Sequence, residues 1–305
     1  MQNLSKLKKS KNALVIAHYY QESEIQDAAD YVGDSLGMAL YAQKQNCKIA
    51  VVAGVRFMAE TIKVMNPGKK VLLPDLNAGC SLADSCTPEV FSTFLLQHPG
   101  AFVMTYVNSS LAIKAMSDVI CTSANALKIA SRVPADREII FAPDQHLGKF
   151  IMKKLGRPMT LFPGNCFVHT SFSAKEMVKL KTRHPDAEII AHPECEDVIL
   201  SQADFIGSTG QLLKYTQESK AQKFIVMTEP GIIHQMKKAS PDKVFIEGPD
   251  LEGCACNNCP HMKLNTHEKL IACLENEAPE IRIPPSLQLA AMKPLQKMVE
   301  MTGAI

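Results

Sequence analysis

Short apolar runs rich in Val and Ile recur along the whole chain, and each is bounded by Gly, Pro or polar residues. Runs of this length are typical of buried parallel strands. Between them lie amphipathic stretches with helical spacing of their apolar positions, for example residues 39–45 and 174–180. This alternation predicts an α/β fold.

The positions at which the apolar runs end form a pattern that repeats three times. The ends are His18, Gly33, Gly54 and Pro74, then Tyr106, Cys121, Pro143 and Pro163, then His192, Gly207, Thr228 and Glu247. The steps within the three sets are 15, 21 and 20 residues, then 15, 22 and 20, then 15, 21 and 19. Limited helix and loop lengths give similar intervals in any α/β chain, so the repeat needs a second observation.

The second run of each set supplies that observation, because its local sequence is similar each time. It reads DYVG at 30–33, DVIC at 118–121 and DFIG at 204–207, and a serine follows at 35, 123 or 208. The repeat is too long for a solenoid. We therefore predict three homologous Rossmann-like α/β/α units around a pseudo-threefold axis. The expected units are residues 1–83, 84–168 and 169–262, with C-terminal helices in 263–305 packing back on the first unit.

Charge and hydropathy exclude several classes of partner. The 305-residue chain has a net charge of +2 and no Trp, so neither a basic surface nor an aromatic platform for nucleic acid is indicated. No apolar run approaches the roughly 20 residues that span a bilayer, and the first run is too short for a signal-peptide core. We expect a cytoplasmic protein that binds small molecules, with no nucleic-acid or membrane partner.

Polar side chains follow the predicted strands, at the edge where parallel sheets bind ligands. If three units face one axis, these groups converge. His, Tyr and Glu supply acid–base chemistry, whereas Ser and Thr at helix starts suit carboxylate or phosphate oxygens. The candidates are His18, Tyr20, Ser35, Tyr106, Asn108, Ser123, His192, Glu194, Ser208 and Thr209.

Cysteine is abundant, with ten residues, and in a reducing compartment this favours metal binding or catalysis over disulfides. Cys47, Cys121, Cys195 and Cys273 lie beside apolar residues and are expected in the core. Each unit also has a cysteine after its fourth strand, namely Cys80, Cys166 and the group Cys254, Cys256 and Cys259. Three thiolates would leave one iron of a [4Fe–4S] cluster open as a Lewis acid. The alternative is a structural zinc site, which takes four protein ligands.

The combined motifs resemble the quinolinate synthase family over nearly the whole chain. They are AHYYQ (17–21), GDSL (33–36), PDLNAGCSLADSC (74–86), MTYVNSS (104–110), FAPDQHLG (141–148), PGNCFVH (163–169), AHPEC (191–195), GSTG (207–210) and CNNCPHMKLNT (256–266). The resemblance implies three α/β domains around an axis, a central active-site cavity and a [4Fe–4S] cluster held by one cysteine per domain. It also implies condensation of iminoaspartate with dihydroxyacetone phosphate to quinolinate, with release of phosphate and two waters, in NAD biosynthesis.

Carried over by this resemblance, the cluster ligands are Cys80, Cys166 and Cys259, since the family's third ligand precedes a Pro-x-Met segment, here Pro260 to Met262. Cys254 and Cys256 are then extra, and they either pair as a redox switch or replace Cys259. The roles implied for the other candidates fall into three groups. His18 and Tyr20 are acid–base residues and Glu194 a base; Tyr106, Asn108 and His192 orient intermediates; and Ser35, Ser123, Ser208 and Thr209 hold carboxylates and phosphate.

Two other functions stay open at this point. One is a different iron–sulfur hydro-lyase on the same fold. The other is a zinc-stabilised, redox-sensing binding protein in which the last cysteine motif is structural. For the main hypothesis, a functional link to the enzyme that makes iminoaspartate is the expected partnership.

Overall fold

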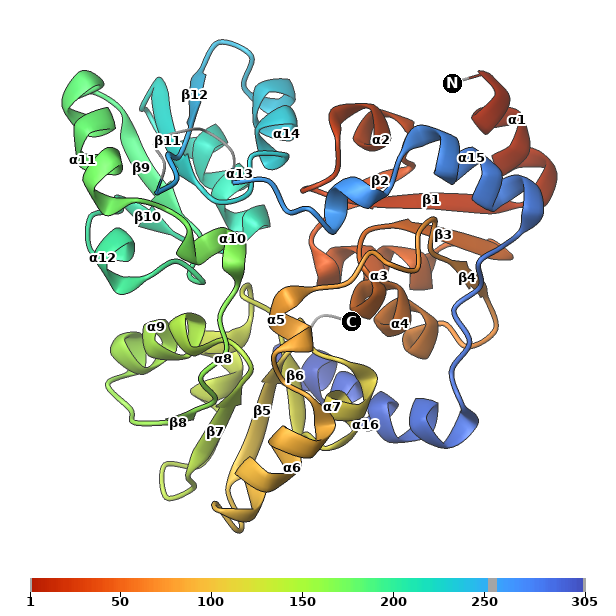
Figure 1. Ribbon diagram of the computed structural model, residues 1–305, viewed down its shortest axis with the longest axis horizontal. Helices are drawn as coiled ribbons and strands as arrows, with labels where there is room; N and C mark the ends of the chain where they lie inside the picture. Colours follow the sequence, from red (N-terminus) through yellow and green to blue (C-terminus); the bar gives the residue numbers. More distant parts are fainter. Residues whose placement is uncertain (1, 252–256, 304–305) are drawn as a thin grey trace.

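The computed structural model describes residues 2–251 and 257–303, and these residues form three parallel four-stranded sheets with helices packed on them. The spatial strand orders are β2-β1-β3-β4, β6-β5-β7-β8 and β10-β9-β11-β12, so all three sheets have the same topology. The units lie around a common centre, the first and third side by side and the second below them in the view of Figure 1. The predicted repeat of α/β units is confirmed.

All twelve strands end within two residues of the predicted positions. The first sheet contains β1 (Ala13–His18), β2 (Tyr31–Gly33), β3 (Ile49–Ala53) and β4 (Lys70–Leu72). The second contains β5 (Phe102–Tyr106), β6 (Val119–Cys121), β7 (Ile139–Ala142) and β8 (Thr160–Leu161). The third contains β9 (Glu188–Ala191), β10 (Phe205–Ile206), β11 (Lys223–Met227) and β12 (Val244–Glu247).

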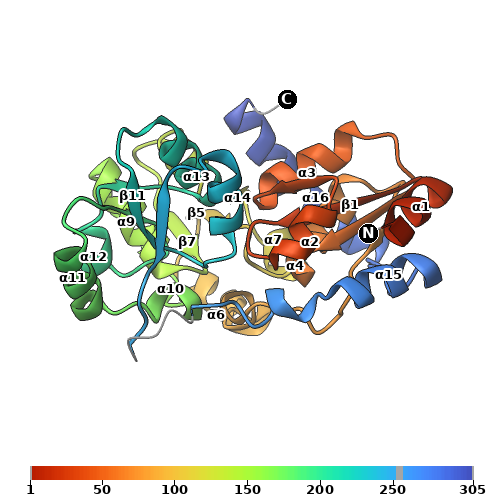
Figure 2. The ribbon, with the colours of Figure 1, turned by 90° about the horizontal axis from the view of Figure 1, so that it is seen from above.

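Helices connect the strands and cover the faces of the sheets, as Figures 1 and 2 show. Those up to the end of the first sheet are α1 (Gln2–Lys11), α2 (Ser23–Ala28), α3 (Ser35–Lys44) and α4 (Arg56–Met65). The next are α5 (Ser81–Asp84), α6 (Pro88–Leu96), α7 (Leu111–Ala115), α8 (Ala126–Ala130), α9 (Gln145–Leu155) and α10 (Phe167–Thr170). Around the third sheet and beyond it lie α11 (Ala174–Arg183), α12 (Asp197–Leu200), α13 (Thr209–Glu218), α14 (Ile232–Ala239), the 3₁₀ turn η1 (Met262–Leu264), α15 (His267–Asn276) and α16 (Pro285–Thr302).

The repeated aspartate before each second strand has the same structural role in every unit. The carboxylates of Asp30, Asp118 and Asp204 accept hydrogen bonds of 2.8 Å from the amides of Val15, Val103 and Ile189, respectively. The aspartate amides donate back to the carbonyls of the same three residues. These amides come just before the residues at which each central strand begins to pair with its shorter edge strand, so the aspartate completes the sheet at that point.

The two C-terminal helices pack in different places. We expected both on the first unit, and α15 contacts α1 and β3 there. Helix α16 instead lies mainly against α7, β6 and α8 of the second unit, while also contacting α4 of the first. Its apolar stripe, which includes Ala291, Leu295 and Met298, fills the space between the two units. The division at residues 83, 168 and 262 stays a prediction.

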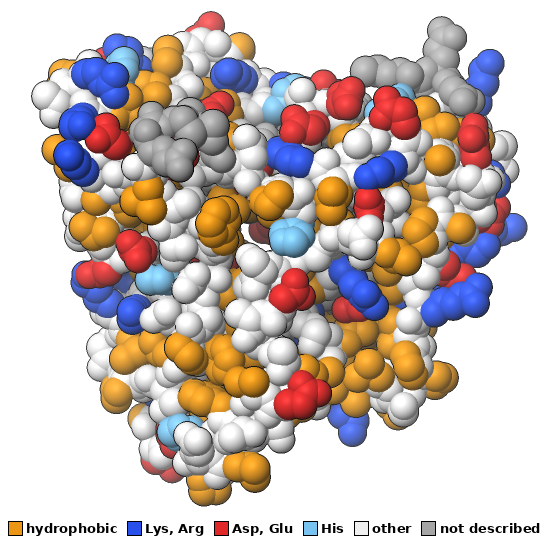
Figure 3. Space-filling model, viewed as in Figure 1, with side chains coloured by type: hydrophobic (Ala, Val, Ile, Leu, Met, Phe, Trp, Pro, Cys, Tyr) orange, Lys and Arg blue, Asp and Glu red, His pale blue; other side chains and the backbone are white. Residues whose placement is uncertain are grey.

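Acidic and basic side chains are interspersed with hydrophobic ones over the face shown in Figure 3. Within residues 2–251 and 257–303, no helix combines the length and apolar character needed to cross a membrane.

Candidate functional site

A cavity lies where the three units meet, and residues that follow strands of all three sheets line it. Twelve of the thirteen predicted site residues contribute to its wall. They are His18, Tyr20, Ser35, Cys80, Tyr106, Asn108, Ser123, Cys166, His192, Glu194, Thr209 and Cys259. Their convergence follows from the topology, because the carboxyl ends of the strands in each sheet face the common centre.

Ser208 is the exception, since it does not line the cavity. Its hydroxyl accepts a hydrogen bond from the Gln211 amide, and the Gln211 side chain accepts one from the Ser208 amide in return. This capping box satisfies the first turn of α13. The neighbouring Thr209 reaches the cavity in its place, so Ser208 has no part in the substrate site that we propose.

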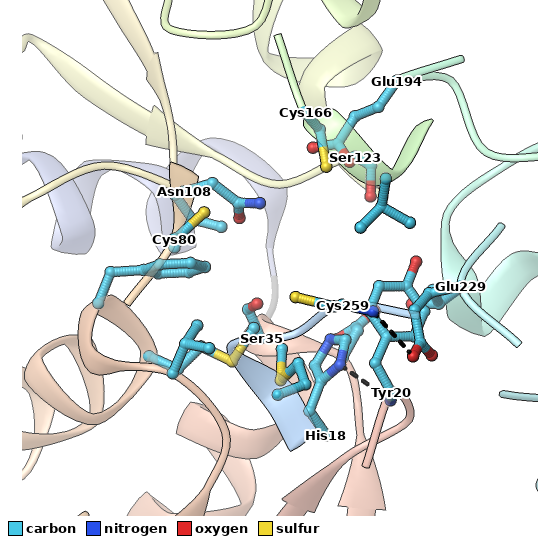
Figure 4. A pocket seen from close by; sticks show the side chains of 18 of the residues that line it. His18, Tyr20, Ser35, Cys80, Asn108, Ser123, Cys166, Glu194, Glu229 and Cys259 are labelled. Carbon is cyan, nitrogen blue, oxygen red and sulfur yellow. Dashed lines mark hydrogen bonds between the residues drawn. The ribbon is translucent and has the colours of Figure 1, made fainter. Parts of the chain in front are cut away.

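The three cavity cysteines share a local structure. Cys80 and Cys166 are the N-cap residues of the short helices α5 and α10, and Cys259 lies just before η1. Backbone amides of the following turn face each sulfur and lower its thiol pKa, partly opposing the effect of burial. Figure 4 shows the sulfur atoms of Cys80, Cys166 and Cys259 turned towards the same space.

Burial governs the ionisation of the three cavity thiols. Burial, with smaller repulsion from Cys259 and Glu194, raises the pKa of Cys80 to about 12. Burial and repulsion from Glu194 and Cys80 also raise the pKa of Cys166. Burial also raises the pKa of Cys121 and Cys195, which do not line the cavity, so the convergence of three sulfurs, and not their pKa, is what would suit a cationic metal group. The donor set therefore suits a cluster held by three cysteines.

A second group of metal-ligating atoms overlaps the first. Ligand atoms of Cys166, His169 and Glu194 all lie within 4.8 Å of one another, so they could hold a single ion. This set contains only one sulfur and could hold a zinc ion, at a different place from the last cysteine motif to which the zinc alternative was assigned. Cys254 and Cys256, the residues on which the redox-switch hypothesis depends, lie outside the described part of the chain.

Buried acid–base groups form the rest of the wall. Burial lowers the pKa of both His18 and His192 to about 3, although Glu194 opposes the shift in each case. Glu194 is 2% exposed, and burial alone would raise its pKa. Attraction to His169 and a hydrogen bond from that residue outweigh burial and lower the Glu194 pKa. The cavity thus combines neutral imidazoles with an ionised carboxylate.

The two tyrosines of the wall have the opposite character. Burial raises the pKa of Tyr20 and Tyr106 well above the ordinary value, and Glu194 adds to the effect in both. Their hydroxyls are therefore protonated and available as donors at neutral pH. The amide of Tyr20 donates to His18 Nδ1 at 3.2 Å, a contact that fixes the two predicted acid–base residues together (Figure 4).

Sequence reasoning assigned no site role to several polar residues at the cavity, among them His169, Thr228 and Glu229. His169 and Glu229 line the cavity, and Thr228 lies buried directly behind it. His169 follows Cys166 by one helical turn, so its place within the PGNCFVH motif was an available signal. Thr228 and Glu229 end a predicted strand, but their side-chain directions follow from packing between units and are not visible in sequence.

Glu229 anchors the segment that carries Cys259. One of its oxygens accepts hydrogen bonds from Lys263 Nζ at 3.0 Å and from the Cys259 amide at 3.4 Å. The other accepts from the Gly231 amide at 2.7 Å. The carboxylate is fully buried, and the dashed line in Figure 4 marks its contact with Cys259. The third cysteine is therefore held by a charge network that joins the first and third units.

Fold and site together define a class: a three-unit α/β protein in which every unit contributes a cysteine thiol and polar groups to one shared cavity. A family model described as "Quinolinate synthetase A protein" matches residues 2–300. The chain therefore belongs to this family.

Individual relatives agree with the family model. The chain is 57% identical to a quinolinate synthase from Trichodesmium erythraeum, over 98% of this chain and 93% of that protein. It is 56% identical to one from Nostoc punctiforme, over 98% and 92%, and 55% identical to one from Chloroherpeton thalassium, over 99% and 94%.

Proposed function

We propose that this protein is a quinolinate synthase, which condenses iminoaspartate with dihydroxyacetone phosphate to quinolinate, phosphate and two waters. The observation that carries the proposal is the convergence of one thiol from each unit with buried His, Tyr and Glu side chains in a single cavity. Membership of the family supports the same reaction.

Cys80, Cys166 and Cys259 would hold a [4Fe–4S] cluster in this proposal, and its fourth iron, without a protein ligand, would supply Lewis-acid chemistry to substrate oxygens. The remaining wall residues bind substrate and handle protons. Ser35 and Thr209 are the first residues of α3 and α13, and the positive end of a helix favours carboxylate or phosphate oxygens. Ser123, Tyr106 and Asn108 complete this polar wall.

Proton transfer falls to the buried groups. The neutral imidazole of His18 and the protonated hydroxyl of Tyr20 can exchange protons with a substrate held between them. Glu194 is ionised and suits the role of a base. His192 lies beside Glu194 and would orient intermediates. We further propose cytoplasmic localisation and a functional link to the enzyme that makes iminoaspartate.

Protein purified without oxygen tests the proposal through its iron and sulfide content, its visible spectrum and a direct assay for quinolinate. We expect about four irons and four sulfides per chain, together with quinolinate from the two substrates. Serine at 80, 166 or 259 should abolish cluster binding. Cys47→Ser is the matched control, because Cys47 packs beside the first core and does not line the cavity.

Other outcomes would redirect the assignment. A colourless protein with one zinc after anaerobic reconstitution would contradict the cluster, and loss of that zinc in His169→Gln would place it on Cys166, His169 and Glu194. A normal cluster in Cys259→Ser would move the third ligand to Cys254 or Cys256. A four-iron cluster without quinolinate formation would favour a different hydro-lyase.

A further inference from the structure

A fully buried lysine lies behind the cavity wall, at the junction of the first and second units. Lys114 of α7 is 0% exposed, and its Nζ lies 5.3 Å from the centre of the Phe57 ring, which belongs to α4 of the first unit. Phe57 lines the cavity, whereas Lys114 does not. Burial of a lysine is costly, so its charge or its hydrogen bonds have to account for its presence here.

One N–H group of the lysine has a clear structural use. Lys114 Nζ donates to the Ser109 carbonyl at 2.5 Å. Ser109 closes a tight turn, because its amide donates to the Val107 carbonyl and its hydroxyl donates to the Tyr106 carbonyl. Tyr106 and Asn108 of this turn line the cavity. A neutral donor could make the same contact, so this hydrogen bond does not by itself require a positive charge.

The cavity provides a use for the charge. Among the described residues, its wall contains no Lys or Arg side chain. It does contain the carboxyl groups of Asp34, Glu194 and Glu229, together with the three cysteine thiols. The substrates of the proposed reaction add a dicarboxylate and a phosphate. A lysine or arginine that attracts these anions therefore has to act from behind the wall.

The charge of Lys114 is not neutralised by a neighbouring carboxylate. Lys263, by comparison, pairs with Glu229 at 3.0 Å and with Glu22 at 3.3 Å. Within residues 2–251 and 257–303, Lys114 has no carboxylate at ion-pair distance, and Glu60 acts on it only by longer-range attraction. Burial lowers the pKa of Lys114 to about 7, and attraction to Glu60 and Cys80 opposes this shift. Anions bound in the cavity would oppose it further, so the lysine is charged when the cavity is filled.

We propose that Lys114 is a specificity-determining residue of the active site: its buried charge, held behind Phe57 and the turn at Asn108, favours anionic ligands in the cavity. Solvent screens a charge buried between two units only weakly, so its field reaches across the Phe57 ring. In the view of Figure 4, Asn108 and Cys80 lie on one side of the cavity, which is the side that this charge acts on. The inference rests on the proposed function and adds which property of the substrate Lys114 recognises.

Two ligands that differ by one charge test the proposal. Quinolinate, the product of the proposed reaction, carries two carboxylates, and pyridine-2-carboxylate has the same ring with one. Calorimetry measures their binding to protein purified without oxygen. In Lys114→Met, which keeps the length of the side chain without its charge, we expect Kd to rise about 30-fold for quinolinate but about 5-fold for pyridine-2-carboxylate, since Coulomb attraction scales with ligand charge.

The unequal losses separate an effect of charge from an effect of structure. If Lys114 only holds the turn at Ser109, both ligands should weaken by the same factor, and this result would overturn the proposal. An unchanged Kd for quinolinate would overturn it as well. Lys114→Gln, which keeps an N–H donor but no charge, is the second neutral variant in case Lys114→Met does not fold, and it should show the same unequal losses.

Lys128→Met is the matched control for net charge. Lys128 is exposed on α8 and does not line the cavity, so we expect both Kd values to change less than about 2-fold. Losses in Lys128→Met as large as those in Lys114→Met would overturn a specific role for the buried lysine.

The same measurements distinguish this inference from the proposed function. Wild-type protein that binds quinolinate with the expected dependence on Lys114, but forms none from the two substrates, would contradict the proposed reaction alone. Normal quinolinate formation together with equal losses for the two ligands would contradict the role of Lys114 alone. Wild-type protein that neither binds nor forms quinolinate would contradict both.

Discussion

The first unit meets the second and the third through interfaces of opposite character. Between the first and second units, apolar side chains from both sheets and from α16 form one continuous core. Leu295 and Met298 of α16 are at most 1% exposed within it. The end of α16 is also held by the second unit, since Lys128 and Arg132 donate to the carbonyls of Thr302 and Met301. This interface resembles the interior of one domain.

The interface between the first and third units depends on polar atoms. Gln26 Nε2, for example, donates at 2.8 Å to the Gly231 carbonyl across it, and Lys263 Nζ joins the Tyr20 carbonyl to Glu229. The cores of the third unit are separate from the one that the first two units share, although Tyr19 and Tyr20 pack against one of them.

The difference follows from what each interface has to do. Apolar burial is non-directional and strong, so it suits a permanent joint but cannot orient a hydroxyl or a carboxylate. A satisfied polar network gives less net stability and fixes direction. The proposed acid–base groups Tyr20 and Glu194 lie at the polar interface, where direction matters. We therefore expect mutations at the two interfaces to separate stability from site geometry.

The largest effect should come from the apolar interface. Leu295→Ala removes a fully buried side chain from the shared core, and we expect the free energy of unfolding to fall by about 3–5 kcal/mol. Leu289→Ala on the same helix is the control, since Leu289 is 68% exposed and should change stability by about 0.5 kcal/mol or less. Denaturant unfolding of both variants checks this, and equal losses would show that α16 is not a core element.

A smaller loss is expected at the polar interface. Lys263→Met removes the cation beside the fully buried Glu229, whose pKa burial raises to about 7 even with Lys263 present. Breaking a buried ion pair lowers the free energy of unfolding by about 3–5 kcal/mol. We expect a loss of about 2 kcal/mol here, because the Lys263 side chain is 19% exposed and therefore partly solvated.

Glu229→Gln in the Lys263→Met background should recover most of this loss, because no unpaired charge then remains. The same denaturant series measures it. If the stability losses of the two substitutions simply add, the coupling energy between Lys263 and Glu229 is zero. The polar interface would then depend on its neutral hydrogen bonds.

The contrast between the interfaces also shows what sequence could reveal. Strand ends, unit count and most of the cavity wall were predictable, because parallel strands of fixed length bring their carboxyl ends to one place. The repetition of Asp30, Asp118 and Asp204 helped to identify the three units, but their hydrogen bonds to the central strands could not be predicted from sequence. The path of α16 could not be predicted, since an amphipathic stripe does not specify which of two apolar surfaces it covers.

The direction of individual side chains was the second feature that the sequence could not predict. Ser35 and Ser208 follow equivalent strands, yet only Ser35 lines the cavity, because Asp34 caps α3 and leaves Ser35 free. In the third unit glycine precedes Ser208, so the serine itself becomes the cap. Thr228 was recognisable as a strand end, but its contacts with Tyr20 and His169 exist only after two units meet.

The smallest effect should appear where the second and third units touch at the surface. Lys153 Nζ lies 3.1 Å from Asp197 Oδ1, and their side chains are 67% and 65% exposed. Water and salt screen such a pair, so we expect a coupling energy below about 0.5 kcal/mol in a cycle of Lys153→Met and Asp197→Asn. Unfolding measured at low and high salt checks this. A coupling energy as large as that between Lys263 and Glu229 would mean that exposed ion pairs also hold the third unit in place. Burial would then not explain the difference in strength between exposed and buried ion pairs.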